Sequence, residues 1–165
     1  MPDPASVYLR DAGPDDADEL ARLTAGHATS GRNADQWRSW IADAATIVLV
    51  AETSGAGIVG FLDVRRAADE AEIIDLWVAP PSRRAGIAFA LLDRIAIDLA
   101  TRGTARLFLE VAVDNAPARA LYTRQGFEAV ARREAYYTRP SGERVDALLM
   151  VRDIDASKRD HRCEC

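Results

Sequence analysis

A short basic turn is the part of the chain best suited to bind an anion. Residues 83–88, with the sequence RRAGIA, follow the β-type run at 76–78 and open a long helical pattern. The start of a helix has backbone N–H groups without intrahelical acceptors and a partial positive charge, and both favour a phosphate. Gly86 and Ala88 allow close approach to the backbone, and the two arginines add charged donors. The same spacing also fits an ordinary strand-to-helix connection, so the turn alone leaves both interpretations open.

Three polar residues further along the chain offer acid–base and hydrogen-bonding groups. Glu110 lies in an otherwise apolar run and could simply face solvent, because side chains alternate along a strand. Tyr122 could be an aromatic residue at the edge of the core. Asn115 precedes a helical pattern with Pro117 in its first turn, which is typical of a helix N-cap. Local pattern therefore gives each residue a structural as well as a chemical interpretation.

Composition limits the class of protein. The chain has 165 residues with a formal net charge of −5 and a pI near 5.1, which argues against general nucleic-acid binding. No apolar run approaches the ~18 residues of a membrane span, and the first residues lack the pattern of a signal peptide. We therefore expect a cytoplasmic protein with no nucleic-acid or membrane partner, either a monomer or a homodimer.

Cysteine usage points away from thiol and metal chemistry. Cys163 and Cys165 lie at the very end of the chain, with only His161 nearby. A reduced terminal tail explains these residues better than a metal site, which needs more ligands at suitable spacing. Without a cysteine in the body of the chain, we expect neither a bound metal nor catalysis through a thiolate.

Hydrophobic periodicity predicts alternating strands and helices in one α/β domain. The expected strands are residues 7–11, 46–51, 58–64, 71–78, 107–113, 127–137 and 146–151, and the expected helices are 14–25, a short one around Trp37 to Ile41, 86–102, and one between Asn115 and Gly126. Hairpins at both ends with helical crossovers between them imply a mixed sheet with helices on its faces. The predicted domain covers residues 1–154, and 155–165 are expected to form a flexible tail.

The order of elements and the motifs together resemble the GNAT superfamily of acetyl-CoA-dependent N-acetyltransferases. The family's acyl-CoA loop has Arg or Gln, two residues, Gly, one residue, and Gly or Ala, which Arg83, Gly86 and Ala88 match. The second half resembles the RimI-type branch, whose members acetylate the N-terminal alanine of a small-subunit ribosomal protein. That likeness rests on Leu109-Glu110-Val111, Asp114-Asn115, Ala120-Leu121-Tyr122, Gly126-Phe127, and the segments at 132–137 and 146–150.

The resemblance implies a GNAT fold, with a central mixed and mostly antiparallel sheet, and roles for individual residues. By it, Glu110 is the general base, Tyr122 is the general acid, and Asn115 contacts CoA. The resemblance assigns the remaining acetyl-CoA contacts to Leu76, Trp77 and Val78 for the acetyl and pantetheine portion, and to Arg83, Arg84, Ala85, Gly86, Ile87, Ala88 and Phe89 for the pyrophosphate. Tyr136 and Tyr137 are assigned to the acceptor. Because neighbouring strand residues point to opposite faces, only one of these two is expected to line the acceptor site.

The chemistry of amine acylation fits these residue types. An amine attacks a thioester only as the neutral species, so a carboxylate is needed to remove its proton. A tyrosine hydroxyl can protonate the departing sulfur. An α-amine has a pKa of about 8 and a lysine amine about 10.4, so deprotonating the former at neutral pH costs roughly 3 kcal/mol less. One carboxylate suffices for an α-amine, and direct transfer needs no covalent acyl-enzyme.

The chain departs from the branch pattern in two places. In the loop, Ala88 replaces the usual second glycine and Phe89 stands where another basic residue is common, so one phosphate contact is expected to be missing. The segment 27–45, which is expected to form part of the acceptor site, shows no clear match to the branch, and this leaves the acceptor open. The favoured acceptor is a protein N-terminus, and the alternatives are a small amine, such as an amino acid, polyamine or aminoglycoside, or no acceptor at all in a non-catalytic acyl-CoA sensor. An acidic group could attract a cationic acceptor or form a solvated edge: Asp63, Asp69, Glu70, Glu72 and Asp75.

Overall fold

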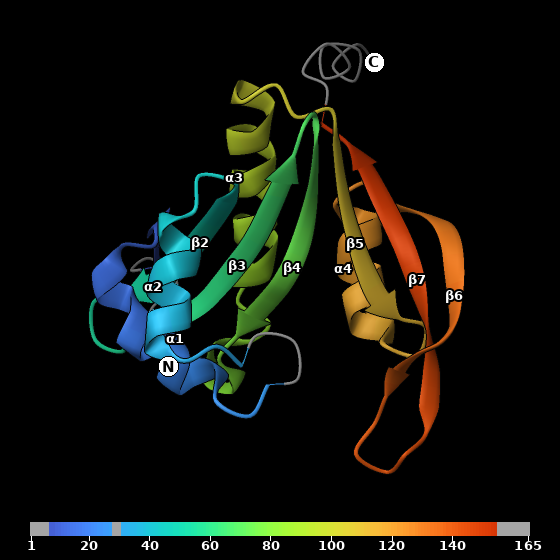
Figure 1. The fold of residues 1–165 in the computed structure, drawn as a ribbon, viewed down its shortest axis with the longest axis horizontal. Helices are drawn as coiled ribbons and strands as arrows, with labels where there is room; N and C mark the ends of the chain where they lie inside the picture. The colour runs from blue at the N-terminus through green and yellow to red at the C-terminus, as the bar shows by residue number, and fades with distance from the viewer. Residues whose placement is uncertain (1–6, 28–30, 155–165) are drawn as a thin grey trace. The chain divides into compact units, whose positions relative to one another are not determined.

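The computed structural model describes residues 7–27 and 31–154, and it contains every predicted strand and helix (Figure 1). The strands are β1 (Val7–Asp11), β2 (Thr46–Thr53), β3 (Gly57–Ala67), β4 (Glu70–Val78), β5 (Arg106–Ala112), β6 (Glu128–Thr138) and β7 (Arg144–Asp153). The helices are α1 (Ala17–Thr24), α2 (Ala34–Ala42), α3 (Ile87–Thr101) and α4 (Ala116–Arg124), with 3-10 turns η2 (Pro14–Asp16) and η3 (Pro80–Ser82). The expected tail, including His161 and both cysteines, lies outside the described residues.

The strands form one seven-stranded mixed sheet in the order β1-β2-β3-β4-β5-β7-β6, which confirms the predicted fold class. β4 and β5 pair in parallel, through residues 70–72 and 106–108. The pairs β1–β2, β2–β3, β5–β7 and β6–β7 are antiparallel. β7 therefore lies between β5 and β6, although β6 comes first along the chain.

The chain divides into two compact units. The N-terminal unit comprises residues up to 67 together with 73–95, and the C-terminal unit comprises 68–72 together with the residues from 96 onward. Across the ranges 7–27 and 31–154, no helix combines the length and apolar character needed to span a membrane.

In the N-terminal unit, α1 and α2 cover one face of β2 and β3, and α3 begins on the other face (Figure 1). Trp37 of α2 is completely buried and meets Phe61 of β3 edge to face, with 5.6 Å between ring centroids. Its indole N–H donates to the Thr24 hydroxyl at 3.3 Å, so its polar atom is also satisfied. Trp37 is therefore a core anchor and not a wall of a substrate pocket.

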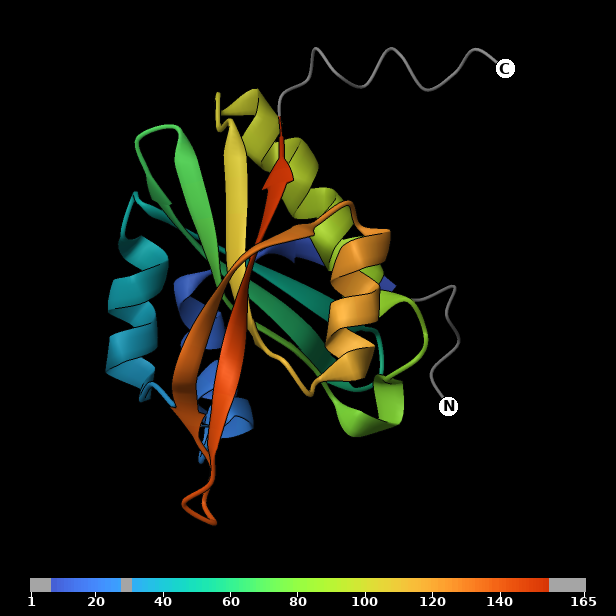
Figure 2. The same ribbon diagram turned by 90° about the vertical axis from the view of Figure 1, so that its right-hand side faces the viewer.

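In the C-terminal unit, β6 and β7 form a long twisted hairpin, and α4 precedes it (Figure 2). The hairpin's turn lies at residues 139–143, where the Gly142 N–H donates to the Arg139 carbonyl at 2.8 Å. α3 ends in this unit at Thr101, and Gly103, two residues further on, has a φ of 74°. The Thr104 N–H donates to the Leu99 carbonyl and the Gly103 N–H to the Ala100 carbonyl, which is the glycine-terminated cap expected from the sequence.

Candidate active site

The basic turn of the N-terminal unit folds into a sharp loop that ends at the start of α3. Arg84 and Gly86 both adopt left-handed conformations, with φ of 63° and 78°. The Gly86 carbonyl accepts the first helical hydrogen bond, from the Ala90 N–H at 2.9 Å. A Cβ built at Gly86 would meet no atom within 4 Å, so the space beside this backbone is open. A helix start with an adjacent left-handed turn and open space fits a phosphate group.

The arginines of this loop do not behave alike. Both side chains are exposed, but the Arg83 Nε donates to the Val78 carbonyl at 3.0 Å. Arg83 therefore fastens the loop to the end of β4 with one of its donors. Within the loop, Ile87 is buried and Ala88 is half-buried, so these two residues anchor the helix start.

The end of β4, at Leu76, Trp77 and Val78, is held by close backbone contacts. A Cβ at Gly60 would lie 3.0 Å from the Trp77 carbonyl oxygen, so β3 approaches this strand end as closely as a glycine permits. The Leu76 N–H donates to the Asp75 carboxylate at 2.8 Å. The Trp77 ring stacks on Phe61 with centroids 6.1 Å apart. These contacts fix the segment predicted to bind the acetyl and pantetheine portion.

Asp63 of β3 is not part of a solvated acidic edge, so that interpretation is wrong for this residue. Its side chain is completely buried, and it accepts hydrogen bonds from Arg32 at 2.8 Å and from the Trp40 indole at 2.6 Å. The Arg32 guanidinium also lies 4.2 Å from the Trp40 ring centroid. Burial raises the pKa of Asp63, while Trp40 and Arg32 oppose that shift. Asp63 therefore ties β3 to Arg32, just before α2, and to Trp40, near the end of α2, and it does not attract free cations.

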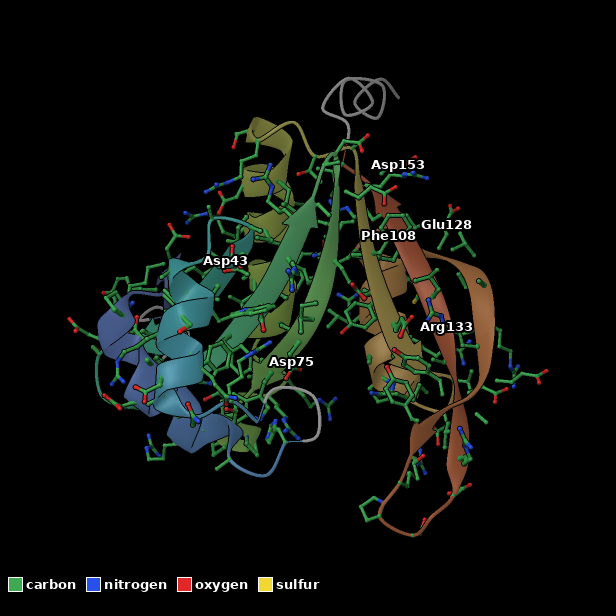
Figure 3. All side chains as sticks on the ribbon, viewed as in Figure 1. Asp43, Asp75, Phe108, Glu128, Arg133 and Asp153 are labelled. Carbon is green, nitrogen blue, oxygen red and sulfur yellow. The ribbon has the colours of Figure 1, made fainter. Side chains whose placement is uncertain are left out.

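In the C-terminal unit, Glu110 of β5 is shielded from solvent. Only 12% of its side chain is exposed, and its carboxylate lies 3.1 Å from the Arg133 Nε. Arg133 of β6 is labelled in Figure 3. The Tyr136 hydroxyl also donates to this carboxylate, and that hydrogen bond raises the pKa of Tyr136. Alternation along β5 therefore did not leave Glu110 facing solvent. The sequence motif contained Arg133, but nothing in its pattern assigned the residue a role.

The prediction that Tyr136 and Tyr137 point to opposite faces of a strand is wrong. Their rings meet edge to face with centroids 5.1 Å apart. Ala135 has a φ of 48°, and the pairing with β7 shifts between Arg133 and Tyr137, so the chain does not alternate regularly here. Burial, and then the nearby charge of Glu110, raise the pKa of Tyr137 to about 12.

Tyr122 is anchored at the last turn of α4. The helix ends at Arg124, Gly126 follows with a φ of 86°, and the Phe127 N–H donates to the Tyr122 carbonyl at 3.0 Å. The Tyr122 and Phe127 rings touch with centroids 5.8 Å apart, which is the apolar contact that often accompanies this kind of helix end. Phe127 is buried and Tyr122 is half-buried, so the contact with Phe127 restrains the position of the Tyr122 side chain.

Asn115 has the structural role that the sequence allowed for it. Its side-chain oxygen accepts a hydrogen bond from the Ala118 N–H at 3.3 Å, and the residue occupies the N-cap of α4. The side chain is exposed.

Each unit thus gathers one half of the predicted chemistry. The N-terminal unit brings together the loop at 83–89 and the strand end at 76–78. The C-terminal unit brings Glu110 together with Tyr136, Tyr137 and Arg133.

A family model and a sequence relative both match a large part of this chain. Residues 15–127 match the family described as "Acetyltransferase (GNAT) family". The chain is 36% identical over 102 residues to the [ribosomal protein bS18]-alanine N-acetyltransferase of Escherichia coli strain K12, covering 62% of this chain and 68% of the relative.

Solved structures share the fold. The crystal structure of the ribosomal-protein-S18-alanine N-acetyltransferase from Escherichia coli has a TM-score of 0.79 and 27% identity, over 90% of this chain and 94% of that chain. The structure of Arabidopsis thaliana NAA60 in complex with acetyl-CoA has a TM-score of 0.77 at 19% identity, over 90% of this chain and 99% of that one. The family match, the sequence relatives and the shared architecture agree, and the chain belongs to the GNAT family of acetyltransferases.

Proposed function

We propose that this acetyltransferase moves the acetyl group of acetyl-CoA to the N-terminal amine of a protein. The observation that carries the proposal is the shielded Glu110 carboxylate, which is hydrogen-bonded by Tyr136 and paired with Arg133. The relative from Escherichia coli is an enzyme acting on the alanine terminus of ribosomal protein bS18, and an N-terminal alanine is the acceptor that we favour here.

On the donor side, the loop at 83–89 is suited to the pyrophosphate of acetyl-CoA. Gly86 leaves open space beside the helix start, and the exposed Arg84 adds a charged donor. Because Arg83 donates to the Val78 carbonyl, the loop and the end of β4 are joined. Acetyl-CoA supplies the activated acyl group, and the backbone at 76–78 would orient it.

On the acceptor side, Glu110 accepts the proton that the amine must lose before it attacks. This carboxylate is mostly out of water and has a phenol and a guanidinium as partners, so it is a positioned group and not a solvated surface charge. The Tyr122 hydroxyl returns a proton to the departing sulfur. An α-amine is easier to deprotonate than a lysine amine, so one carboxylate base suffices for it.

The test is a panel of acceptors assayed by CoA release. It contains a peptide with a free N-terminal alanine, the same peptide with a blocked N-terminus, a polyamine, an aminoglycoside and free amino acids. We expect turnover of the free peptide and none of the blocked one. Turnover of small amines alone would replace the protein acceptor with a small-molecule one. Calorimetric binding of acetyl-CoA without turnover on any amine would favour a sensor.

A further inference from the structure

Both backbone polar groups of Ala135 on β6 are bonded by side chains of β7. The Ala135 N–H donates to the Asp146 carboxylate at 2.8 Å. The Ala135 carbonyl accepts from Arg144 twice, from Nε at 3.1 Å and from Nη2 at 2.8 Å. Strands normally pair backbone to backbone, so two charged side chains here replace a missing part of the ladder.

The Asp146 carboxylate has a second partner, which lies outside the contacts to Ala135. Its second oxygen accepts from the Arg132 Nε at 2.6 Å, so each carboxylate oxygen has its own donor. The Ala135 N–H, and then Arg132, lower the pKa of Asp146. We name Asp146, Arg144 and the Ala135 backbone the β7 clamp.

The clamp coincides with the irregularity that reorients the two tyrosines. Ala135 is a non-glycine residue with a φ of 48°, a conformation that an L side chain disfavours and that its surroundings must stabilise. Immediately after it, Tyr136 and Tyr137 meet ring to ring, and Tyr136 reaches the Glu110 carboxylate. In a regular strand these neighbours would face opposite sides of the sheet.

We propose that Asp146 and Arg144 are positioning residues: by holding Ala135 in the left-handed conformation, they present Tyr136 to Glu110 and both tyrosine rings to the amine acceptor. The inference rests on the proposed function, since it takes Glu110 as the base and the tyrosines as acceptor contacts. It adds that acceptor use is controlled from β7, by residues that do not touch the reacting atoms.

The first test compares three variants under steady-state kinetics. Asp146→Ala should lower kcat/KM for the acceptor by about tenfold, while the KM for acetyl-CoA stays within about twofold of wild type. Adding Ala135→Gly to Asp146→Ala should restore much of the loss, because glycine adopts a positive φ without the clamp. Arg132→Ala is the matched control, since it removes an ion pair of Asp146 but leaves the bond to Ala135, and its acceptor kcat/KM should change by less than about twofold.

A merely structural role would give a different pattern. Unchanged acceptor kinetics in Asp146→Ala, an equal rise in both KM values, or no rescue by Ala135→Gly would each overturn the proposal. Melting temperatures establish that each variant is folded under assay conditions. If Asp146→Ala does not fold, Arg144→Gln, which removes the two contacts to the Ala135 carbonyl, must show the same selective loss, and wild-type kinetics there would overturn the proposal.

A second readout does not depend on turnover. Ultraviolet titration of the four tyrosines follows phenolate formation, and Tyr136→Phe identifies the contribution of Tyr136. We expect Asp146→Ala to lower the pKa of Tyr136 toward its ordinary value, because the hydrogen bond to Glu110 is lost. A wild-type titration curve would refute the clamp even if no acceptor were found. Absence of peptide turnover in the wild type together with the expected titration shift would refute only the proposed function.

Discussion

The Arg133 Nε lies 3.1 Å from the Glu110 carboxylate, and it joins the irregular part of β6 to the middle of β5. The guanidinium is more than half exposed, whereas the carboxylate is largely covered. In the proposed reaction, an amine at Glu110 would share its carboxylate with Arg133 and Tyr136.

Replacing Arg133 tests whether this pair matters for chemistry or only for stability. Because Arg133 is half exposed, Arg133→Gln should change the free energy of unfolding by less than about 1 kcal/mol. Its acceptor kcat/KM should fall by about tenfold, because the orientation of Glu110 is lost. Denaturant unfolding and steady-state kinetics measure the two effects, and Arg133→Lys should lie between wild type and Arg133→Gln. A large loss of stability with normal kinetics would reverse this interpretation.

Glu110→Gln should remove the proton acceptor while keeping the shape of the side chain. General-base groups contribute typically about 10²–10⁴-fold to rate, so we expect kcat to fall within that range at neutral pH. The dissociation constant of acetyl-CoA, measured by calorimetry, should be unchanged. A variant with a wild-type pH–rate profile would place the base elsewhere.

Two substitutions at Tyr122 separate its hydroxyl from its ring. Tyr122→Phe keeps the contact with Phe127, so it should lower kcat with little change in melting temperature. Tyr122→Ala removes the ring as well and should also cost about 2 kcal/mol of stability, less than the loss for a fully buried aromatic. If Tyr122→Phe retains full kcat, the tyrosine has a packing role alone.

Gly60→Ala should disturb the proposed acetyl-CoA region. The new Cβ would lie 3.0 Å from the Trp77 carbonyl oxygen and 3.3 Å from the Ile87 side chain. We expect a loss of roughly 1–3 kcal/mol in stability and weaker acetyl-CoA binding by calorimetry. Gly55→Ala is the matched control, because a Cβ there meets nothing within 4 Å. Equal stability and equal acetyl-CoA affinity of the two variants would contradict a specific role for the close approach at Gly60.

The buried Asp63 predicts a pH dependence of stability. Burial raises its pKa in the folded state above the ordinary value of 3.8, so the folded protein holds this proton more tightly than the unfolded chain. The contribution of Asp63 to the free energy of unfolding is therefore largest at a pH below its ordinary pKa. It declines as the pH rises through the raised pKa of the folded protein. Urea unfolding gives the free energy of unfolding of the wild type and of Asp63→Asn. As the pH rises from about 4 to 7, we expect the wild type to lose stability relative to Asp63→Asn. If the wild type instead gains stability relative to Asp63→Asn as the pH rises, then the effect of Arg32 on the pKa of Asp63 outweighs that of burial.

Local signals predicted the elements well because apolar period and helix caps act over a few residues. Gly103 and Gly126 end their helices as the sequence indicated. The insertion of β7 between β5 and β6 depends on pairing between distant segments, which local pattern does not encode.

In the candidate site, too, local sequence motifs were predictable and contacts between distant segments were not. The motif predicted Glu110, Tyr122 and the tyrosine pair as a set, although their catalytic roles remain predictions. The left-handed Ala135 was not predictable, because nothing in an alanine signals a positive φ, and its hydrogen-bond partners lie on β7. The burial of Asp63 likewise arises from Arg32 and Trp40, which lie more than twenty residues away in the sequence.

Phe127 packs in the core and also contacts the side chain of Tyr122. Phe127 is buried just beyond the end of α4, and its ring determines where the Tyr122 phenol rests. Changes in the volume of that core side chain would therefore move a hydroxyl proposed to deliver a proton. Under the proposed function, hydrophobic packing and the position of the proton donor to sulfur then share this pair of rings, so a change that alters the packing would also alter the proton transfer.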